Sequence, residues 1–131
     1  MSTRSFIGIQ NLDGTVTGIY CHHDGYLDGV GATLKAHYTT IRQVLDLVAL
    51  GSLSSLGEDL DYTQAYHRDR GDDLDISTYD SPVDISFDDG GYEFVYLFRP
   101  SDERGSTYSW HYADREVFGK GPEFKPLAFA V

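Results

Sequence analysis

Alternating apolar and polar residues at the start of the chain predict a β-hairpin. Two such runs, 5–12 and 15–21, are separated by the Asp13-Gly14 pair. This pair readily takes the positive φ angles of a two-residue type I′ turn. The beginning of the chain therefore predicts two antiparallel strands joined by a tight turn.

A two-residue loop fixes the expected register of this hairpin. Leu12 pairs with Thr15, and every second residue along each strand then shares a face. The apolar residues divide into Ile7, Ile9, Val16 and Tyr20 on one face and Phe6, Ile19 and Cys21 on the other. Because both faces carry apolar residues, we expect the hairpin to be covered on both sides or to lie centrally in its sheet.

Two helical patterns follow the hairpin. Residues 28–38 repeat an apolar side chain every fourth position, although two glycines weaken the first turn. In the next segment Thr40 and Gln43 form a capping box, and Gly51 is placed to end the helix. The apolar positions expected to face the core are Val30, Leu34 and Tyr38 in the first helix, and Ile41, Val44, Leu45 and Val48 in the second.

The second half of the chain predicts further strands. Residues 62–67 and 83–87 are candidate short strands, with a loop at 70–73 between them. Residues 92–99 and 106–112 form a stronger pair, because aromatic side chains alternate along both. These aromatic rows are Tyr92, Phe94, Tyr96 and Phe98, and Tyr108, Trp110 and Tyr112. The tail is expected to be loop-like at 119–122 before an apolar end at 124–131.

The order of these elements predicts the fold class. A hairpin, two helices and then strands indicate an α+β protein, an antiparallel sheet with two short helices packed on one face. The 131 residues fit one domain, 1–131, with an acidic segment at 58–93.

Among the bulk properties, net charge says most about the classes of partner. The formal net charge is -11, and twelve of the 21 acidic residues lie in 58–93, where Arg68 and Arg70 are the only basic residues. This balance argues against direct binding to nucleic acid or to an anionic membrane, and favours a basic partner or solubility alone. The single cysteine, and the lack of a signal peptide or a run of about 20 apolar residues, favour the cytoplasm.

The segment Cys21-His22-His23-Asp24 is the first candidate for chemistry. Its side chains are of metal-ligand type and follow a strand, and further ligands would come from His37, His67 or His111. A Cys–His nucleophile is the second interpretation of the same residues. A buried thiol with hydrogen-bonded turn histidines is the simpler alternative, because the spacing gives no closed tetrahedral set. We expect no cofactor and no tightly bound metal.

The acidic segment is the second candidate site. Its paired aspartates do not match the spacing of an EF-hand loop, so we expect a carboxylate surface that meets a basic groove, or a solvated face without a partner. Gly29-Val30-Gly31 lacks the remaining residues of a phosphate-binding loop. The residues predicted to contact a partner are Asp59, Asp61, Asp69, Asp72, Asp73, Asp75, Asp88 and Asp89.

The N-terminal part resembles a group of small, mostly uncharacterised proteins encoded by bacteriophages and other mobile elements. The resemblance rests on these stretches: Ser5-Phe6-Ile7-Gly8, Asp13-Gly14-Thr15-Val16, Gly18 to Tyr26, Val30-Gly31 and His37-Tyr38. It covers about the first 57 residues, is looser around Tyr96 and Trp110, and is absent from the acidic middle. The group supplies no catalytic residue to carry over.

The resemblance and the charge together lead to three functional hypotheses. The first is a non-enzymatic inhibitor of a host defence system, an anti-CRISPR or anti-restriction factor that occupies the basic, nucleic-acid-binding groove of a host protein by mimicking DNA. The second is a small metal-assisted or Cys-dependent enzyme that uses Cys21, His22, His23 and Asp24. The third is a structural or regulatory phage protein that forms a homo-oligomer. The oligomeric state does not follow from the sequence.

Overall fold

The computed structural model describes residues 3–102, 104–115 and 124–127, without the side chains of Asp88 and Asp89. The strands are β1 (Ser5–Gln10), β2 (Val16–Cys21), β3 (Leu53–Ser55), β4 (Gln64–Ala65), β5 (Ser77–Tyr79), β6 (Phe94–Pro100), β7 (Tyr108–Asp114) and β8 (Lys125–Pro126). The helices are the π-helical turn η1 (Leu27–Gly31), α1 (Ala32–His37), α2 (Ile41–Val48), α3 (Tyr66–Arg70), the 3₁₀ turn η2 (Pro82–Asp84) and α4 (Phe87–Gly90).

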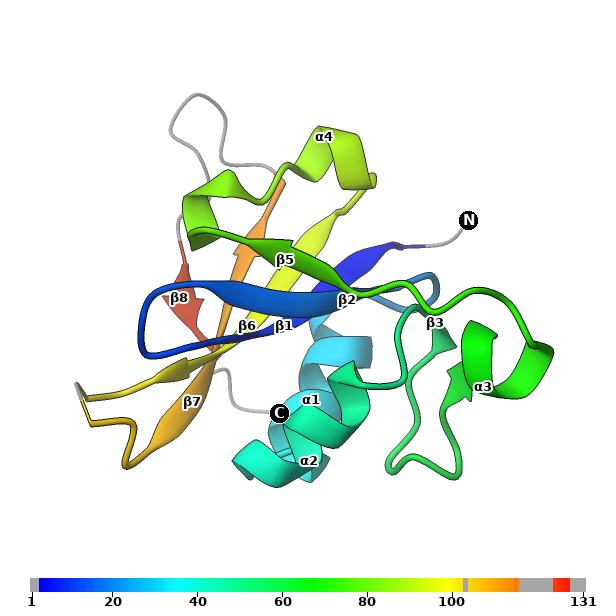
Figure 1. Cartoon of the computed structure of the whole chain (residues 1–131), viewed down its shortest axis with the longest axis horizontal. Helices are drawn as coiled ribbons and strands as arrows, with labels where there is room; N and C mark the ends of the chain where they lie inside the picture. The colour runs from blue at the N-terminus through cyan, green and yellow to red at the C-terminus, as the bar shows by residue number, and fades with distance from the viewer. Residues whose placement is uncertain (1–2, 103, 116–123, 128–131) are drawn as a thin grey trace.

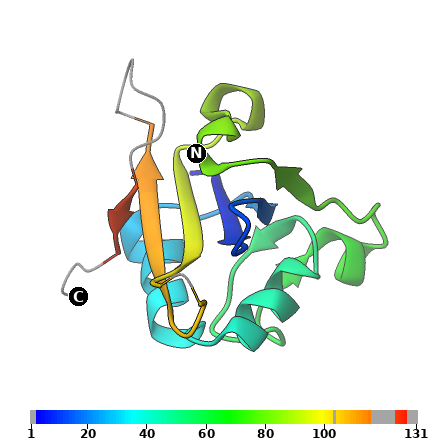
Figure 2. The same ribbon diagram turned by 60° about the vertical axis from the view of Figure 1, so that its left-hand side comes forward.

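These elements form the predicted α+β fold around one mostly antiparallel sheet. The strand order is β4-β3-β2-β1-β6-β7-β8, and β5 pairs with β2 outside this path. Two of the pairings, β1 with β6 and β2 with β3, are parallel. Figures 1 and 2 show α1 and α2 on one side of the sheet and α4 on the other.

The hairpin of β1 and β2 forms as predicted, but the predicted register is wrong by one residue. Gln10 pairs with Val16, and the amide of Asn11 donates to the carbonyl of Thr15 at 2.8 Å, so the loop has three residues. Gly14 in this loop has a φ of +92°. The carboxylate of Asp13 accepts hydrogen bonds from the amide and hydroxyl of Thr15, which stabilises the longer turn.

This shift exchanges the partners on the two faces of the hairpin. Ile7 lies opposite Ile19, and both pack with Ile9 and Cys21 against the helices. Phe6 and Val16 share the opposite core. The hairpin is nevertheless central in the sheet and covered on both faces, as its apolar pattern predicted.

Both predicted helices form, and α2 packs through a different stripe from the one expected. The capping box of Thr40 and Gln43 is present. Val44, Leu47 and Val48 are buried, whereas Ile41 and Leu45 are 38% and 45% exposed. Two overlapping stripes in this segment share Val44 and Val48, and packing against β1 and β2 selects the stripe that contains Leu47.

Glycines give the first helix an irregular start. The turn at Leu27–Gly31 is π-helical, and regular α-helix begins at Ala32. A Cβ added at Gly29 would lie 2.2 Å from the carbonyl oxygen of Asp24, so the chain passes too close to itself for a larger residue.

The aromatic pair of strands is confirmed as β6 and β7. Phe94, Tyr96 and Phe98 share the helix side of the sheet with the β7 row, but Tyr92 precedes β6 and belongs to the opposite core. The indole nitrogen of Trp110 donates to the carbonyl of Tyr38 at 2.8 Å and ties β7 to the end of α1.

The predictions for the acidic segment are partly wrong. Within 62–67 only Gln64–Ala65 is strand, and α3 then begins because the Asp69 carboxylate accepts from the amide of Ala65. The predicted strand at 83–87 is instead η2 followed by α4, since Ser81 caps the turn and Pro82 starts it. The predicted loop at 70–73 is confirmed from Gly71 onward, but Arg70 is the last residue of α3. The predicted loop at 119–122 lies outside the described residues.

The acidic segment also builds part of the fold. Ile85 and Tyr92 are buried with Phe6, Val95 and Leu97 on the face of the sheet opposite α1 and α2. Partly buried Tyr79 and Phe87 pack against the same cluster. Residues 79–92 therefore cover one face of the sheet with apolar side chains, whereas Leu60 and Ala65 of the same segment pack with the core on the helix side. Among the helices described, none is long and apolar enough to cross a membrane.

Candidate functional site

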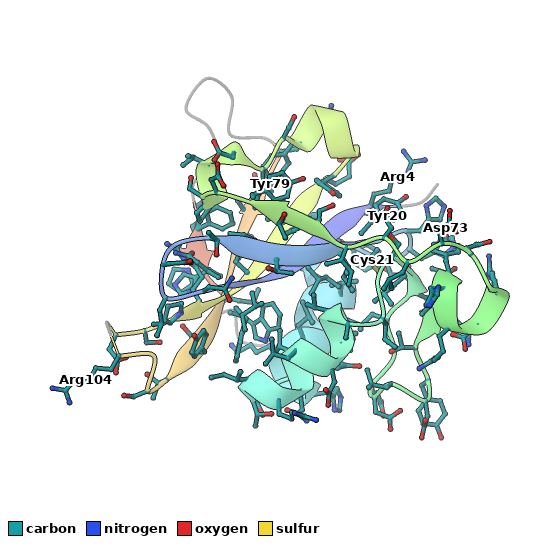
Figure 3. The ribbon with its side chains drawn as sticks, viewed as in Figure 1. Arg4, Tyr20, Cys21, Asp73, Tyr79 and Arg104 are labelled. Carbon is teal, nitrogen blue, oxygen red and sulfur yellow. The ribbon has the colours of Figure 1, made fainter. Side chains whose placement is uncertain are left out.

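The segment Cys21-His22-His23-Asp24 joins the end of β2 to the turn η1. Cys21 is 0% exposed and pairs with Ser5 across the hairpin, and its thiol lies 3.6 Å from the carbonyl of His23. Burial raises the pKa of the Cys21 thiol to about 12. Figure 3 shows Tyr20 and Cys21 pointing to opposite sides of β2. The thiol is thus protonated at neutral pH, inside the core that packs against the helices.

The two histidines of this segment are held by the neighbouring strand β3. The amides of His22 and His23 donate to the carbonyls of Leu53 and Ser54 at 2.9 and 3.0 Å. The Nδ1 atom of His22 lies 2.5 Å from the hydroxyl of Tyr20, and the two imidazole rings meet edge to face at 4.6 Å. Loss of hydration, and then the charges of His23 and Arg4, lower the pKa of His22, which favours its neutral form.

Asp24 and the glycine after it turn the chain into the first helix. Asp24 has a φ of 58°, and its carbonyl accepts from the amide of Val30 at 2.8 Å. The buried hydroxyl of Tyr96 donates a hydrogen bond to the carbonyl of Gly25 at 2.7 Å. The segment therefore forms a strand-to-helix junction.

The structure does not bring these residues together with the other predicted ligands. Over the described ranges, no group of three or more His, Cys, Asp or Glu side chains is arranged to hold a metal ion. His37 ends α1, His67 lies in α3 with its Nδ1 2.7 Å from the carbonyl of Asp72, and His111 lies in β7. Cys21 is buried and the pKa of its thiol is raised, which does not favour a nucleophile.

Three of the predicted partner-binding aspartates hold the local fold. Asp59 accepts from the amides of Asp61 and Tyr62. Asp69 accepts from the amide of Ala65 and pairs with the Arg68 guanidinium at 2.9 Å, which lowers the pKa of Asp69. Asp75 accepts weakly from the hydroxyl of Ser52 at 3.4 Å.

The other predicted aspartates lie in the chain after α3, in the loop before β4 and in α4. Asp61, Asp72 and Asp73 are exposed. Figure 3 shows Asp73 on the α3 side of the molecule, far from Arg104 at the β6–β7 turn. Asp88 and Asp89 lie in α4, and their side chains are outside the described residues.

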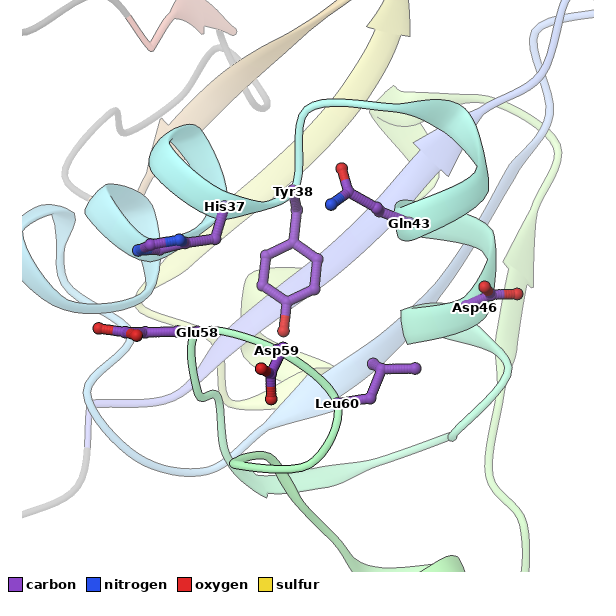
Figure 4. A pocket seen from close by; sticks show the side chains of 7 residues that line it. All are labelled: His37, Tyr38, Gln43, Asp46, Glu58, Asp59 and Leu60. Atoms are coloured by element: carbon purple, nitrogen blue, oxygen red, sulfur yellow. The ribbon is translucent and has the colours of Figure 1, made fainter.

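A small pocket beside α2 was not foreseen from the sequence. It has a volume of about 100 Å³ and is lined by His37, Tyr38, Gln43, Asp46, Glu58, Asp59 and Leu60. Figure 4 shows the Tyr38 ring in the middle of this group, with Gln43 and Asp46 on α2 and Glu58 to Leu60 on the facing loop. We call these seven residues the Tyr38 pocket. Three of them are acidic.

The loop that closes the Tyr38 pocket is held on several sides. The hydroxyl of Tyr38 donates to the carbonyl of Gly57 at 2.9 Å, and Thr63 accepts from the amide of Gly57 at 3.0 Å. Arg68 donates to the carbonyls of Leu60 and Thr63 at 2.9 and 2.6 Å. The acidic pair of Glu58 and Asp59 was the only sequence signal for this pocket, because the contact of α2 with the loop depends on the tertiary fold.

The exposure of the acidic side chains is uniform. All ten acidic side chains that the structure describes in 58–93 are exposed, and among them only Asp69 forms an ion pair with a described residue.

Comparison of the chain with protein-family models, with curated proteins and with solved structures gives no match.

Proposed function

We propose that this protein is a non-enzymatic inhibitor that binds the basic, nucleic-acid-binding groove of a host protein through its acidic surface. The observation that carries the proposal is the exposure of all ten described acidic side chains in 58–93, with a single ion pair among them. Carboxylates that are not neutralised within the protein remain available to cationic side chains of a partner. Apolar residues of the same segment pack into both cores and so anchor the segment to the fold.

The setting of this function is part of the proposal. The resemblance of the N-terminal part to phage and mobile-element proteins favours the cytoplasm of a bacterial host. There, basic grooves that hold DNA or RNA occur in restriction enzymes and CRISPR nucleases. A folded array of carboxylates competes with the phosphates of DNA, which carries one charge per about 1.7 Å of helix axis.

The proposal is tested with nucleases and with DNA as a competitor. We expect the protein to inhibit plasmid cleavage by at least one member of a panel of restriction enzymes and Cas nucleases. We also expect double-stranded DNA to displace the protein from that nuclease. Inhibition should fall at least about tenfold as NaCl rises from about 50 to about 300 mM, because charge attraction is screened.

A pair of charge-matched variants locates the effect. Asp72→Asn with Asp73→Asn removes two charges from the exposed loop between α3 and β5, and should slow association with the nuclease. Asp24→Asn with Asp28→Asn removes two charges outside 58–93, and should change association less. Charge mimicry is wrong if no nuclease of the panel is inhibited, or if DNA does not displace the protein.

A further inference from the structure

We infer that the Tyr38 pocket receives the end of one arginine or lysine side chain of a basic protein partner. The volume of the pocket, about 100 Å³, accommodates the end of one long side chain. This inference rests on the proposed function for the identity of the partner, and on the pocket itself for the chemistry of the ligand.

The walls of the pocket fit the stem of such a side chain. The Tyr38 ring is 2% exposed and forms the inner wall, while half-buried Leu60 lies on the facing loop. The Tyr38 hydroxyl already donates to the carbonyl of Gly57, so the inner wall offers the occupant mainly carbon. Long cationic side chains bury their methylene groups against apolar surface and keep the charged end at a polar rim.

The charges around the pocket select a cation. Asp46, Glu58 and Asp59 contribute three carboxylates from two separate elements, α2 and the loop before β4. Asp59 uses one oxygen for the amides of Asp61 and Tyr62, and Asp46 lies 3.4 Å from the exposed guanidinium of Arg42. Glu58 is exposed on the loop that faces α2. An anionic ligand would be repelled here, on a protein whose net charge is -11.

The pocket is already formed in the protein without a partner. The loop of Glu58 and Asp59 is fixed by hydrogen bonds with Tyr38, which follows α1, with Thr63, which precedes β4, and with Arg68 of α3. A preformed pocket avoids the entropic cost of ordering a loop on binding. A partner side chain anchored in this pocket would also fix where the acidic surface of this protein lies on the partner.

The ligand chemistry is tested with small probes and does not require the partner. The 15N-labelled protein is titrated with N-acetyl-arginine amide, and with the matching amides of citrulline and norleucine. We expect the arginine probe to shift amide signals of Gln43, Asp46 and residues 58–60 in the millimolar range. Citrulline, which has the same shape without the charge, and norleucine should shift them much less.

Two variants distinguish this pocket from general attraction to an acidic protein. Glu58→Gln should weaken binding of the arginine probe up to about fivefold, since an exposed ion pair contributes about 0.2 to 1 kcal/mol. Leu60→Ala should also weaken it. Asp28→Asn, which removes the same charge outside 58–93, should leave the probe's affinity unchanged.

The inference is overturned if the arginine signals spread over the acidic residues generally, or if citrulline binds as well as arginine. It is also overturned if Asp28→Asn has the effect of Glu58→Gln. Failure of the proposed function has a different signature: no nuclease is inhibited, while the arginine probe still shifts the signals of the Tyr38 pocket. Binding to an inhibited nuclease that is unaffected by Glu58→Gln and Leu60→Ala overturns the assignment of the pocket to that partner.

Discussion

Individual residues of the Cys21 to Gly25 segment illustrate how the same side chains serve chemistry or structure according to their surroundings. A cysteine beside two histidines has the composition of a metal or nucleophile site. Here the sulfur faces the core, and the two histidine amides bond to β3. The thiol is held in its protonated form because burial removes the water that would solvate an ionised sulfur, and this outweighs the opposing effect of the nearby polar groups of His23 and Ser5.

Cys21 should therefore react slowly in the folded protein. We expect a thiol reagent at about pH 8 to label native Cys21 at least about 100-fold more slowly than the chain unfolded in guanidinium chloride. The reactive thiolate is rare in the folded protein, where the pKa of Cys21 is raised to about 12, but common in the unfolded chain, where a thiol pKa is about 8.5. Labelling followed by mass spectrometry measures both rates. Native labelling within a factor of about ten of the unfolded rate would show an accessible thiolate, and would revive the Cys-dependent enzyme.

Among the helices and turns, the sequence predicts an element best where a side chain hydrogen-bonds to the backbone of its own turn. The capping box of Thr40 and Gln43 is such a signal, and it places the start of α2 correctly. The hairpin turn shows the opposite case. Asp13-Gly14 suits a two-residue loop, yet the bonds from Asp13 to Thr15 stabilise a loop of three residues and exchange the faces of the hairpin.

The cap of α2 gives a prediction at this scale. Thr40→Ala removes the oxygen that accepts from the amide of Gln43 at 3.2 Å, and should lower the free energy of unfolding by about 1 kcal/mol. Thr40→Ser keeps the oxygen and should cost much less. Urea unfolding followed by circular dichroism measures both variants. Equal stability of Thr40→Ala and the parent protein would mean that the cap contributes nothing.

In the whole molecule, the acidic segment contributes both to the packed cores and to the charged surface. Residues 79–92 cover one face of the sheet, while Leu60 and Ala65 pack on the other face with α1 and α2. The exposed carboxylates thus belong to a segment that the fold needs, and they repel one another on a protein whose net charge is -11.

Screening of this repulsion should stabilise the protein. We expect the melting temperature to rise by about 3 °C between about 10 and about 300 mM NaCl, because repulsion between exposed charges decays over a Debye length of about 10 Å at 0.1 M salt. The variant with Asp72→Asn and Asp73→Asn should melt higher at low salt and gain less from NaCl. Scanning calorimetry measures both, and a melting temperature that falls with NaCl would show that attractive ion pairs dominate.

The fold class, the central hairpin, both helices and the aromatic strand pair follow from local patterns in the amino-acid sequence. These patterns are periodicity and capping, which act within a few residues. The register of the hairpin, the buried stripe of α2 and the short strands β3, β5 and β8 depend instead on contacts between distant parts of the folded chain. A two-residue or three-residue strand has no period of its own and forms because a neighbour offers unpaired backbone groups. The Tyr38 pocket belongs with these, because α1, α2 and the loop before β4 meet only in the folded chain.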